Sequence, residues 1–359
     1  MKGFTPLELE STLNRALELS RALGDNSAVI RSLWGLFALH VVRGNVGLAR
    51  RQAEQAMNLT GEDTGLLTDV HQALGGVDLT EGKLAAAAEH FAVTNRLYSQ
   101  HRHRRVLFGS DVGVFSLAWG AHGQWLQGHI EEARRQVMQA DTIAAELGHP
   151  FTQMQAAAYR SISYQFEGDL DASWANAEDT VAGCKRHNIA YYHEWGVIVG
   201  GWVMGQRGDV SGGIARIKSG LDALQRQDAA LRLPYYLALL AESQLLAGQE
   251  GAARAALDGA QAVAHQNSDL WYLPELYRLR GLVDPSHAEA HFRRALTLAQ
   301  EQGALSLALR ATTSLAALLQ ANDRAHEAPA LLLPVHNAFP ARLVTPDLIR
   351  ARALLQTLP

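Results

Sequence analysis

Two small groups of side chains in this 359-residue sequence have types and spacing that suggest chemistry. His287 and His291 are four residues apart, a spacing that places two imidazoles on one face of a helix, where they can bind a metal ion. Cys184 precedes Lys185, and a nearby cation favours a reactive thiolate. Two imidazoles still need a third ligand, and no base can be assigned to the thiol. A solvated helix face and an inert small residue are therefore the favoured interpretations, and we predict no metal, no cofactor and no catalytic residue.

A third group is the basic run HRHRR, in which arginine forks can hold a carboxylate or a phosphate. The alternative is a structural insertion whose charges pair with neighbouring helix ends. We expect residues 99–112 to be the longest irregular segment of the chain, with Asp111 capping a helix that begins at Val112. The candidate residues of this insertion loop are His101, Arg102, Arg104, Arg105 and Asp111.

Aromatic residues recur at fixed distances before a series of glycines. Trp195 and Trp202 lie thirteen and six residues before Gly208, and Tyr235 and Glu242 hold the same places before Gly248. Residues seven apart on a helix share one face, so these side chains form a stripe. The same reasoning adds Phe115, His122, Trp125, Arg31, Trp34 and Tyr277 to the candidate groove.

A concave surface lined by such rings can bind a peptide, an aromatic metabolite or a quaternary cation. Glu242 would supply a carboxylate suited to a cationic or hydroxylated ligand. The alternative is that the rings pack between successive helices and only set the pitch of a superhelix.

The stripe belongs to an internal repeat. In every unit but the last, a glycine lies five positions before a small anchor residue. The anchor has small or apolar partners four and seven positions on, which marks one face of a helix. The anchors are separated by 38, 46, 40, 40, 40 and 35 residues; they are Ala49, Ala87, Ala133, Ser173, Gly213, Ala253 and Ala288. Small anchors allow close approach of a second helix, and the glycine ends the first helix.

The segments between the anchors are amphipathic at helical spacing, and no alternating strand pattern is present. We therefore predict an all-α superhelical solenoid of about eight helical hairpins, with residues 1–359 as a single domain and one irregular insertion at about 99–112.

The unit resembles a tetratricopeptide repeat (TPR) stretched from about 34 to about 40 residues. Ala73-Leu74-Gly75 followed by Ala87 and Phe91 is the best single match. The long form is similar to the sensor arrays of bacterial adenylate-cyclase/ATPase fusions and maltose-regulator-type activators. The stretch GSDVGV at 109–114 and the C-terminal helices carry this further likeness. It implies a signalling role, but the sequence holds no Walker motif and no cyclase domain. Because the array begins at Met1, we expect a stand-alone product or an excised fragment.

The charge composition sets limits on partners and location. The 32 Lys and Arg against 36 Asp and Glu leave no basic excess for nucleic acid. The absence of a long apolar run predicts no membrane span, and one cysteine with no signal peptide predicts a cytoplasmic protein.

The favoured function is a non-catalytic binding or scaffold module that recognises a protein, a peptide or a small-molecule effector in the groove. Solenoids offer extended concave surfaces, and their soft curvature can pass on a binding event. The alternative is a helical-repeat enzyme that uses groove residues as acid and base. Its candidates are Glu242, His122, His193, Tyr235 and Tyr277. A purely structural role and homo-oligomerisation remain open from sequence.

Overall fold

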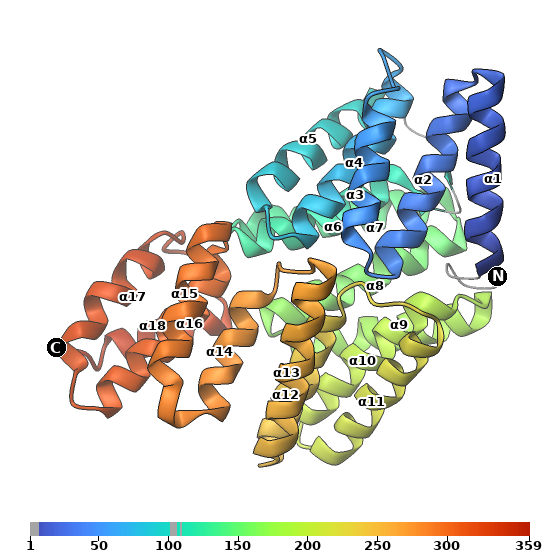
Figure 1. Ribbon diagram of the computed structural model, residues 1–359. Helices are drawn as coiled ribbons and strands as arrows, with labels where there is room; N and C mark the ends of the chain where they lie inside the picture. Colours follow the sequence, from blue (N-terminus) through green and yellow to red (C-terminus); the bar gives the residue numbers. More distant parts are fainter. Residues whose placement is uncertain (1–6, 101–105, 108–109) are drawn as a thin grey trace.

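A computed structural model describes residues 7–100, 106–107 and 110–359. The described chain is built from eighteen α-helices, and its extended structure is one antiparallel ladder of Val106–Leu107 with Ser110–Asp111 (Figure 1). The fold is an all-α, TPR-like solenoid, as predicted. Because the repeat pattern is helical throughout, hairpins follow one another along the whole described chain.

Eight helical hairpins form the array, flanked by α1 (Leu7–Leu23) and α18 (Pro346–Leu355). The first helices of the hairpins are α2 (Asn26–Val42), α4 (Thr64–Thr80), α6 (Val112–Leu126), α8 (Pro150–Glu167), α10 (Ala190–Gln206), α12 (Leu233–Leu246), α14 (Leu273–Val283) and α16 (Leu305–Ala321). The second helices are α3 (Val46–Met57), α5 (Leu84–Gln100), α7 (Ile130–Leu147), α9 (Leu170–His187), α11 (Val210–Arg226), α13 (Glu250–Asn267), α15 (Ala288–Gln302) and α17 (Ala328–Asn337). Single turns of 3₁₀ helix at Pro285–His287 and Ala325–Glu327 precede α15 and α17.

The anchor residues lie where the two helices of a hairpin meet. Ala49, Ala87, Ala133 and Ala253 are all at most 4% exposed, which confirms the predicted burial. At the equivalent position in α11 the chain has Gly213, where a Cβ atom would lie 2.5 Å from the carbonyl oxygen of Gly201 in α10. The backbones of α10 and α11 are therefore in direct contact, which only glycine permits.

Replacing Gly213 with alanine should therefore destabilise the protein, although alanine is the better helix former. The methyl group would meet backbone atoms that cannot rotate away, so the hairpin must open at a cost of about 1–3 kcal/mol. Gly259→Ala is the matched control, because Gly259 lies in α13 with open space around its Cα; it should gain about 0.5–1 kcal/mol. Urea unfolding measures both variants, and equal effects would contradict the backbone contact.

The superhelix closes on itself, so that its second turn lies against its first. The carbonyl of Val42, at the end of α2, accepts hydrogen bonds from the backbone N–H groups of Ala230 and Leu231, just before α12. The carbonyl of Thr80, at the end of α4, accepts in the same way from the N–H groups just before α14. Carbonyls that a helix end leaves unpaired thus meet N–H groups of the turn that leads into another helix. Figure 1 shows the resulting tiers, with the blue N-terminal helices over the green to orange ones.

Aromatic rings fill the space inside this closed superhelix. Their centre is Arg232, which is 1% exposed and whose guanidinium carbon lies 5.1–5.9 Å from the ring centroids of Trp119, Tyr159, Trp195 and Trp271. These rings come from α6, α8, α10 and the segment before α14. Attraction between the cation and the ring faces compensates part of the cost of burying the charge.

The ladder of Val106–Leu107 with Ser110–Asp111 lies inside the predicted irregular segment. Asp111 caps α6, as expected: its carboxylate accepts from the N–H of Val114 at 2.9 Å and from the hydroxyl of Tyr98 at 3.1 Å. The other insertion-loop candidates, His101, Arg102, Arg104 and Arg105, lie outside the described residues. No helix in the described part of the chain is long and apolar enough to cross a bilayer.

Candidate functional site

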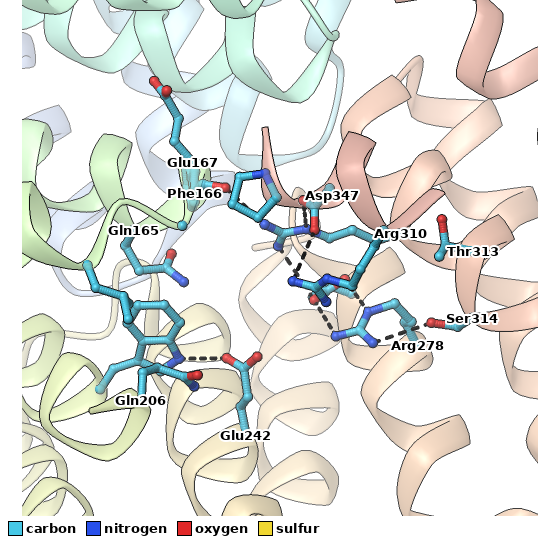
Figure 2. A pocket seen from close by; sticks show the side chains of 16 residues that line it. Gln165, Phe166, Glu167, Gln206, Glu242, Arg278, Arg310, Thr313, Ser314 and Asp347 are labelled. Carbon is cyan, nitrogen blue, oxygen red and sulfur yellow. Dashed lines mark hydrogen bonds and ion pairs between the residues drawn. The ribbon is translucent and has the colours of Figure 1, made fainter. Parts of the chain in front are cut away.

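A cavity of about 270 Å³ opens among the first helices of the second half of the array (Figure 2). Its walls come from the ends of α8 and α10, from α12, α14 and α16, and from the start of α18. The lining includes an indole, an amide and six charged side chains: Trp202, Gln206, Glu242, Glu275, Arg278, Arg310, Asp347 and Arg350.

One wall carries a carboxylate held by an indole. The Trp202 Nε1–H donates to Glu242 Oε2 at 2.6 Å, and Figure 2 shows this bond on the side of the cavity away from the arginines. Trp202 is 6% exposed, whereas Glu242 is only partly buried and lines the cavity. Burial raises the pKa of Glu242, although the indole bond and Arg278 oppose the rise.

The opposite wall carries arginines paired with two carboxylates. Arg278 binds Glu275 with two hydrogen bonds of 2.8 and 2.9 Å within α14. Arg310 of α16 donates to Asp347 of α18 at 2.7 Å and also lies 3.6 Å from Glu275. Arg350 lies 3.7 Å from Asp347 and its side chain is 73% exposed. Burial alone would raise the pKa of Glu275, but Arg278 and Arg310 outweigh it and lower that pKa, which keeps this carboxyl ionised.

Arg310 also connects the cavity to the contact between superhelical turns. Its Nη2 donates to the carbonyl of Phe166 at 3.0 Å, at the end of α8, and its guanidinium lies 5.0 Å from the ring centroid of Trp125. Trp125 in turn stacks on Phe166 with a centroid distance of 4.6 Å. A ligand that competes for Arg310 would therefore act directly on the packing of one turn against the next.

The structure brings some of the sequence-predicted residues to this cavity and places others elsewhere. Trp202 and Glu242 line it. Trp195, Tyr235 and His122 are each 0% exposed and belong to the aromatic interior, where His122 contacts the carbonyl of Tyr159 at 2.9 Å.

The remaining candidate residues of the groove lie outside the cavity lining. Phe115 and Trp34 line a second, much smaller cavity of about 30 Å³ between α2, α6, α8 and α10. Tyr277 lies near His291 of α15, with 6.3 Å between ring centroids, and Arg31 is exposed and donates to Ser27 within α2.

Sequence reasoning did not identify the arginine wall. Trp202 and Glu242 were located by counting back from the glycine that follows each first helix. No glycine follows α14 or α16, so the same count could not be made for these helices. A shorter period would have found it, because Arg278, Ser314 and Arg350 follow Glu242 at steps of 36 residues. Arg278 and Ser314 indeed lie side by side, with Nη1 and Oγ 3.5 Å apart.

The weaker chemical signals in the sequence lead to no site. His287 and His291 both lie near Asp284, at 3.2 and 3.6 Å, but among the described residues no group of three or more His, Cys, Asp or Glu side chains has a metal-binding arrangement. Cys184 is buried, and burial raises the pKa of its thiol to about 12, so the reactive thiolate is disfavoured.

Comparison with known sequences gives a limited result. No family model matches the chain. A protein of Rhizobium meliloti (strain 1021), described as uncharacterized, is 23% identical over 255 residues, which cover 68% of this chain and 25% of that protein. The chain thus spans about a quarter of the length of the curated relative it matches.

Solved structures share the fold at low sequence identity. A Rap protein complexed with competence and sporulation factor aligns with a TM-score of 0.65 at 12% identity, over 97% of this chain and 96% of that one. The Rap conjugation gene regulator of plasmid pLS20, in complex with the Phr* peptide, gives 0.57 at 10% identity, over 91% and 95%. Aspartyl phosphate phosphatase F from Bacillus subtilis gives 0.53 at 12%, over 83% and 75%.

Proposed function

We propose that this chain is a non-catalytic binding module of a bacterial regulatory system, and that the cavity between α8 and α18 is its ligand site. The observation that carries the proposal is the composition of that cavity: a carboxylate on one wall faces three arginines on the other, at the inner surface of five successive hairpins and α18. Concave sites with a few converging polar groups are the usual form of ligand pockets.

Two further observations support a regulatory role. Two solved structures of the same fold are complexes, one with the competence and sporulation factor and one with the Phr* peptide, so this fold can bind a ligand. The sequence also resembles sensor arrays of bacterial signalling proteins. Arg310 could transmit ligand binding to the packing of the superhelix, because it lines the cavity and also donates to the carbonyl of Phe166 at the contact with the first turn.

The enzyme alternative has less support. Of the five residues that the sequence suggested for acid–base chemistry, only Glu242 lines the cavity. His193 pairs with its neighbour Glu194 at 3.0 Å, and His122 is enclosed in the aromatic interior. A general base must reach its substrate within hydrogen-bonding distance, directly or through one water. The positions of His193 and His122 outside the cavity lining do not favour such contact.

A variant with a blocked cavity tests the proposal. Gln206→Trp would place an indole into the space at the end of α10, where Gln206 lines the cavity. The chain is incubated with a deproteinised bacterial extract and examined by native mass spectrometry. We expect the wild type to retain a small molecule or peptide that the variant loses.

The matched control is Gln225→Trp, at an exposed position near the end of α11. It should retain the ligand like the wild type, with helicity unchanged in all three proteins. If the wild type retains nothing, or if Gln206→Trp retains the same mass, the cavity is not the ligand site.

A further inference from the structure

We infer that the cavity accepts a zwitterion, namely a free α-amino acid or a short peptide with both termini unblocked. Its amino group would lie at Glu242 and its carboxylate at the arginine wall. This inference rests on the proposed function and specifies the ligand of the same site.

Glu242 is suited to a ligand cation because no cation of the described residues pairs with it directly, although Arg278 acts on it from a greater distance. Its Oε2 accepts the indole N–H of Trp202, and in the described part of the chain no Lys, Arg or His nitrogen lies within 4 Å of its carboxylate. A partly buried carboxylate without an ionic partner is costly, and an ammonium group would relieve that cost with a charge-assisted hydrogen bond. The neighbouring indole ring adds an attractive surface for the same cation.

The arginine wall is suited to a ligand anion because its cations exceed its anions. Arg278, Arg310 and Arg350 face only two carboxylates, Glu275 and Asp347. Arg350 has the weakest ion pair of the three arginines, because its partner Asp347 is 3.7 Å away and its own side chain is largely exposed. A guanidinium in this state binds a carboxylate with paired hydrogen bonds.

The charge balance of the whole lining distinguishes a zwitterion from a simple ion. Glu167, the remaining acid of the lining, is already bound to Arg134 at 2.7 Å, outside the cavity. With Glu242 on one side and one uncompensated arginine on the other, the cavity is neutral overall but strongly dipolar. A lone anion would leave Glu242 unpaired, and a lone cation would leave the arginine unpaired, whereas a zwitterion pairs both.

The size of the cavity limits the ligand. Its volume of about 270 Å³ lies just below the range of about 300–1,000 Å³ that is typical of pockets for drug-sized ligands. An amino acid or a peptide of two or three small residues fits such a space.

Blocked and unblocked probes test the inference by calorimetric titration of the intact chain. The probes are the twenty free amino acids, Ala-Ala-Ala, N-acetyl-Ala-Ala-Ala and Ala-Ala-Ala-amide. We expect at least one unblocked probe to bind and each block to weaken that binding at least tenfold. For a free amino acid that binds, its own N-acetyl and amide derivatives serve as the blocked pair. The bound probe should also change the tryptophan fluorescence of the wild type, and Trp202→Phe should remove that change.

Two variants that each remove one charge assign the two ends. Glu242→Gln keeps an acceptor for the indole but removes the charge, so it should abolish the preference for a free amino group and leave the preference for a free carboxylate. Arg350→Gln should do the reverse. Glu250→Gln, at an exposed position at the start of α13, is the control and should bind like the wild type.

The outcomes separate this inference from the proposed function. Equal binding of blocked and unblocked probes overturns the zwitterion, and so does binding that neither Glu242→Gln nor Arg350→Gln alters. If none of the probes binds while the extract ligand is still retained by the wild type and lost by Gln206→Trp, the cavity is a ligand site of another class. If that retention also fails, both proposals are wrong.

Discussion

Arg310→Met should lower the free energy of unfolding by about 3–5 kcal/mol, the largest loss that we expect from a single substitution in the cavity. The Arg310 side chain is only 15% exposed, and its guanidinium pairs with Asp347, whose side chain is 17% exposed. Within the described part of the chain, removing Arg310 leaves Asp347 with only the largely exposed Arg350, 3.7 Å away. It also takes one of two arginines from Glu275. The loss of one partner from a largely buried ion pair costs about this much. The carbonyl of Phe166 would also lose its donor. Urea unfolding followed by circular dichroism measures the effect.

A surface arginine provides the comparison. Arg293 pairs with Glu289 one turn away on α15, and its side chain is 46% exposed. Exposed pairs contribute about 0–1 kcal/mol, so Arg293→Met should change stability by less than 1 kcal/mol. Similar losses for the two variants would mean that Arg310 does not connect the turns of the superhelix.

The sequence predicted the hairpins well because their determinants are local. A glycine that ends a helix and a small anchor five residues later act within one repeat, and the burial of Ala49 and Ala253 follows directly from them. Trp202 and Glu242 were found by the same local count and do line the cavity.

The closure of the superhelix could not be predicted in this way. The hydrogen bonds from Ala230 and Leu231 to the carbonyl of Val42 join residues almost 190 positions apart. They depend on the accumulated curvature of four to five repeats, which no single repeat encodes. For the same reason the stripe through Trp195 and Tyr235 was expected to face an open groove, whereas both rings are completely buried in the aromatic interior of the closed superhelix.

The arginine wall was missed for a different reason. Arg310 and Asp347 meet because α16 and α18 lie side by side, and their spacing follows no repeat period used in the sequence argument. Charged residues on helices usually face solvent, so an arginine that points inward has no distinctive local signature.

The pH dependence of stability should reveal the protonation of Asp269. This side chain is 1% exposed and lies beside Arg232. Its Oδ2 accepts the backbone N–H of Arg232 at 2.8 Å. Burial raises the pKa of Asp269 to about 7, although that hydrogen bond, the Arg232 cation and Trp271 lower it in part. The folded chain therefore holds a proton at mildly acidic pH that the unfolded chain, with an ordinary carboxyl pKa near 4, has lost. The stability that depends on this proton is complete below about pH 4 and is lost as pH rises to about 7.

Asp269→Asn should remove this dependence, because the amide oxygen still accepts the Arg232 N–H and carries no charge. The stability of the variant relative to the wild type should rise by up to about 1.4 kcal/mol per pH unit, and by about 2 kcal/mol between pH 5 and pH 7, because the slope halves as the pH reaches the folded pKa. Urea unfolding at the two pH values measures it. Asp222→Asn, at an exposed position on α11, shows whether the loss of any negative charge has the same effect. A difference for Asp269→Asn that stays constant with pH, or that falls as pH rises, would mean that this carboxyl is ionised inside the fold, and the Arg232 guanidinium would then have a true counterion instead of rings alone.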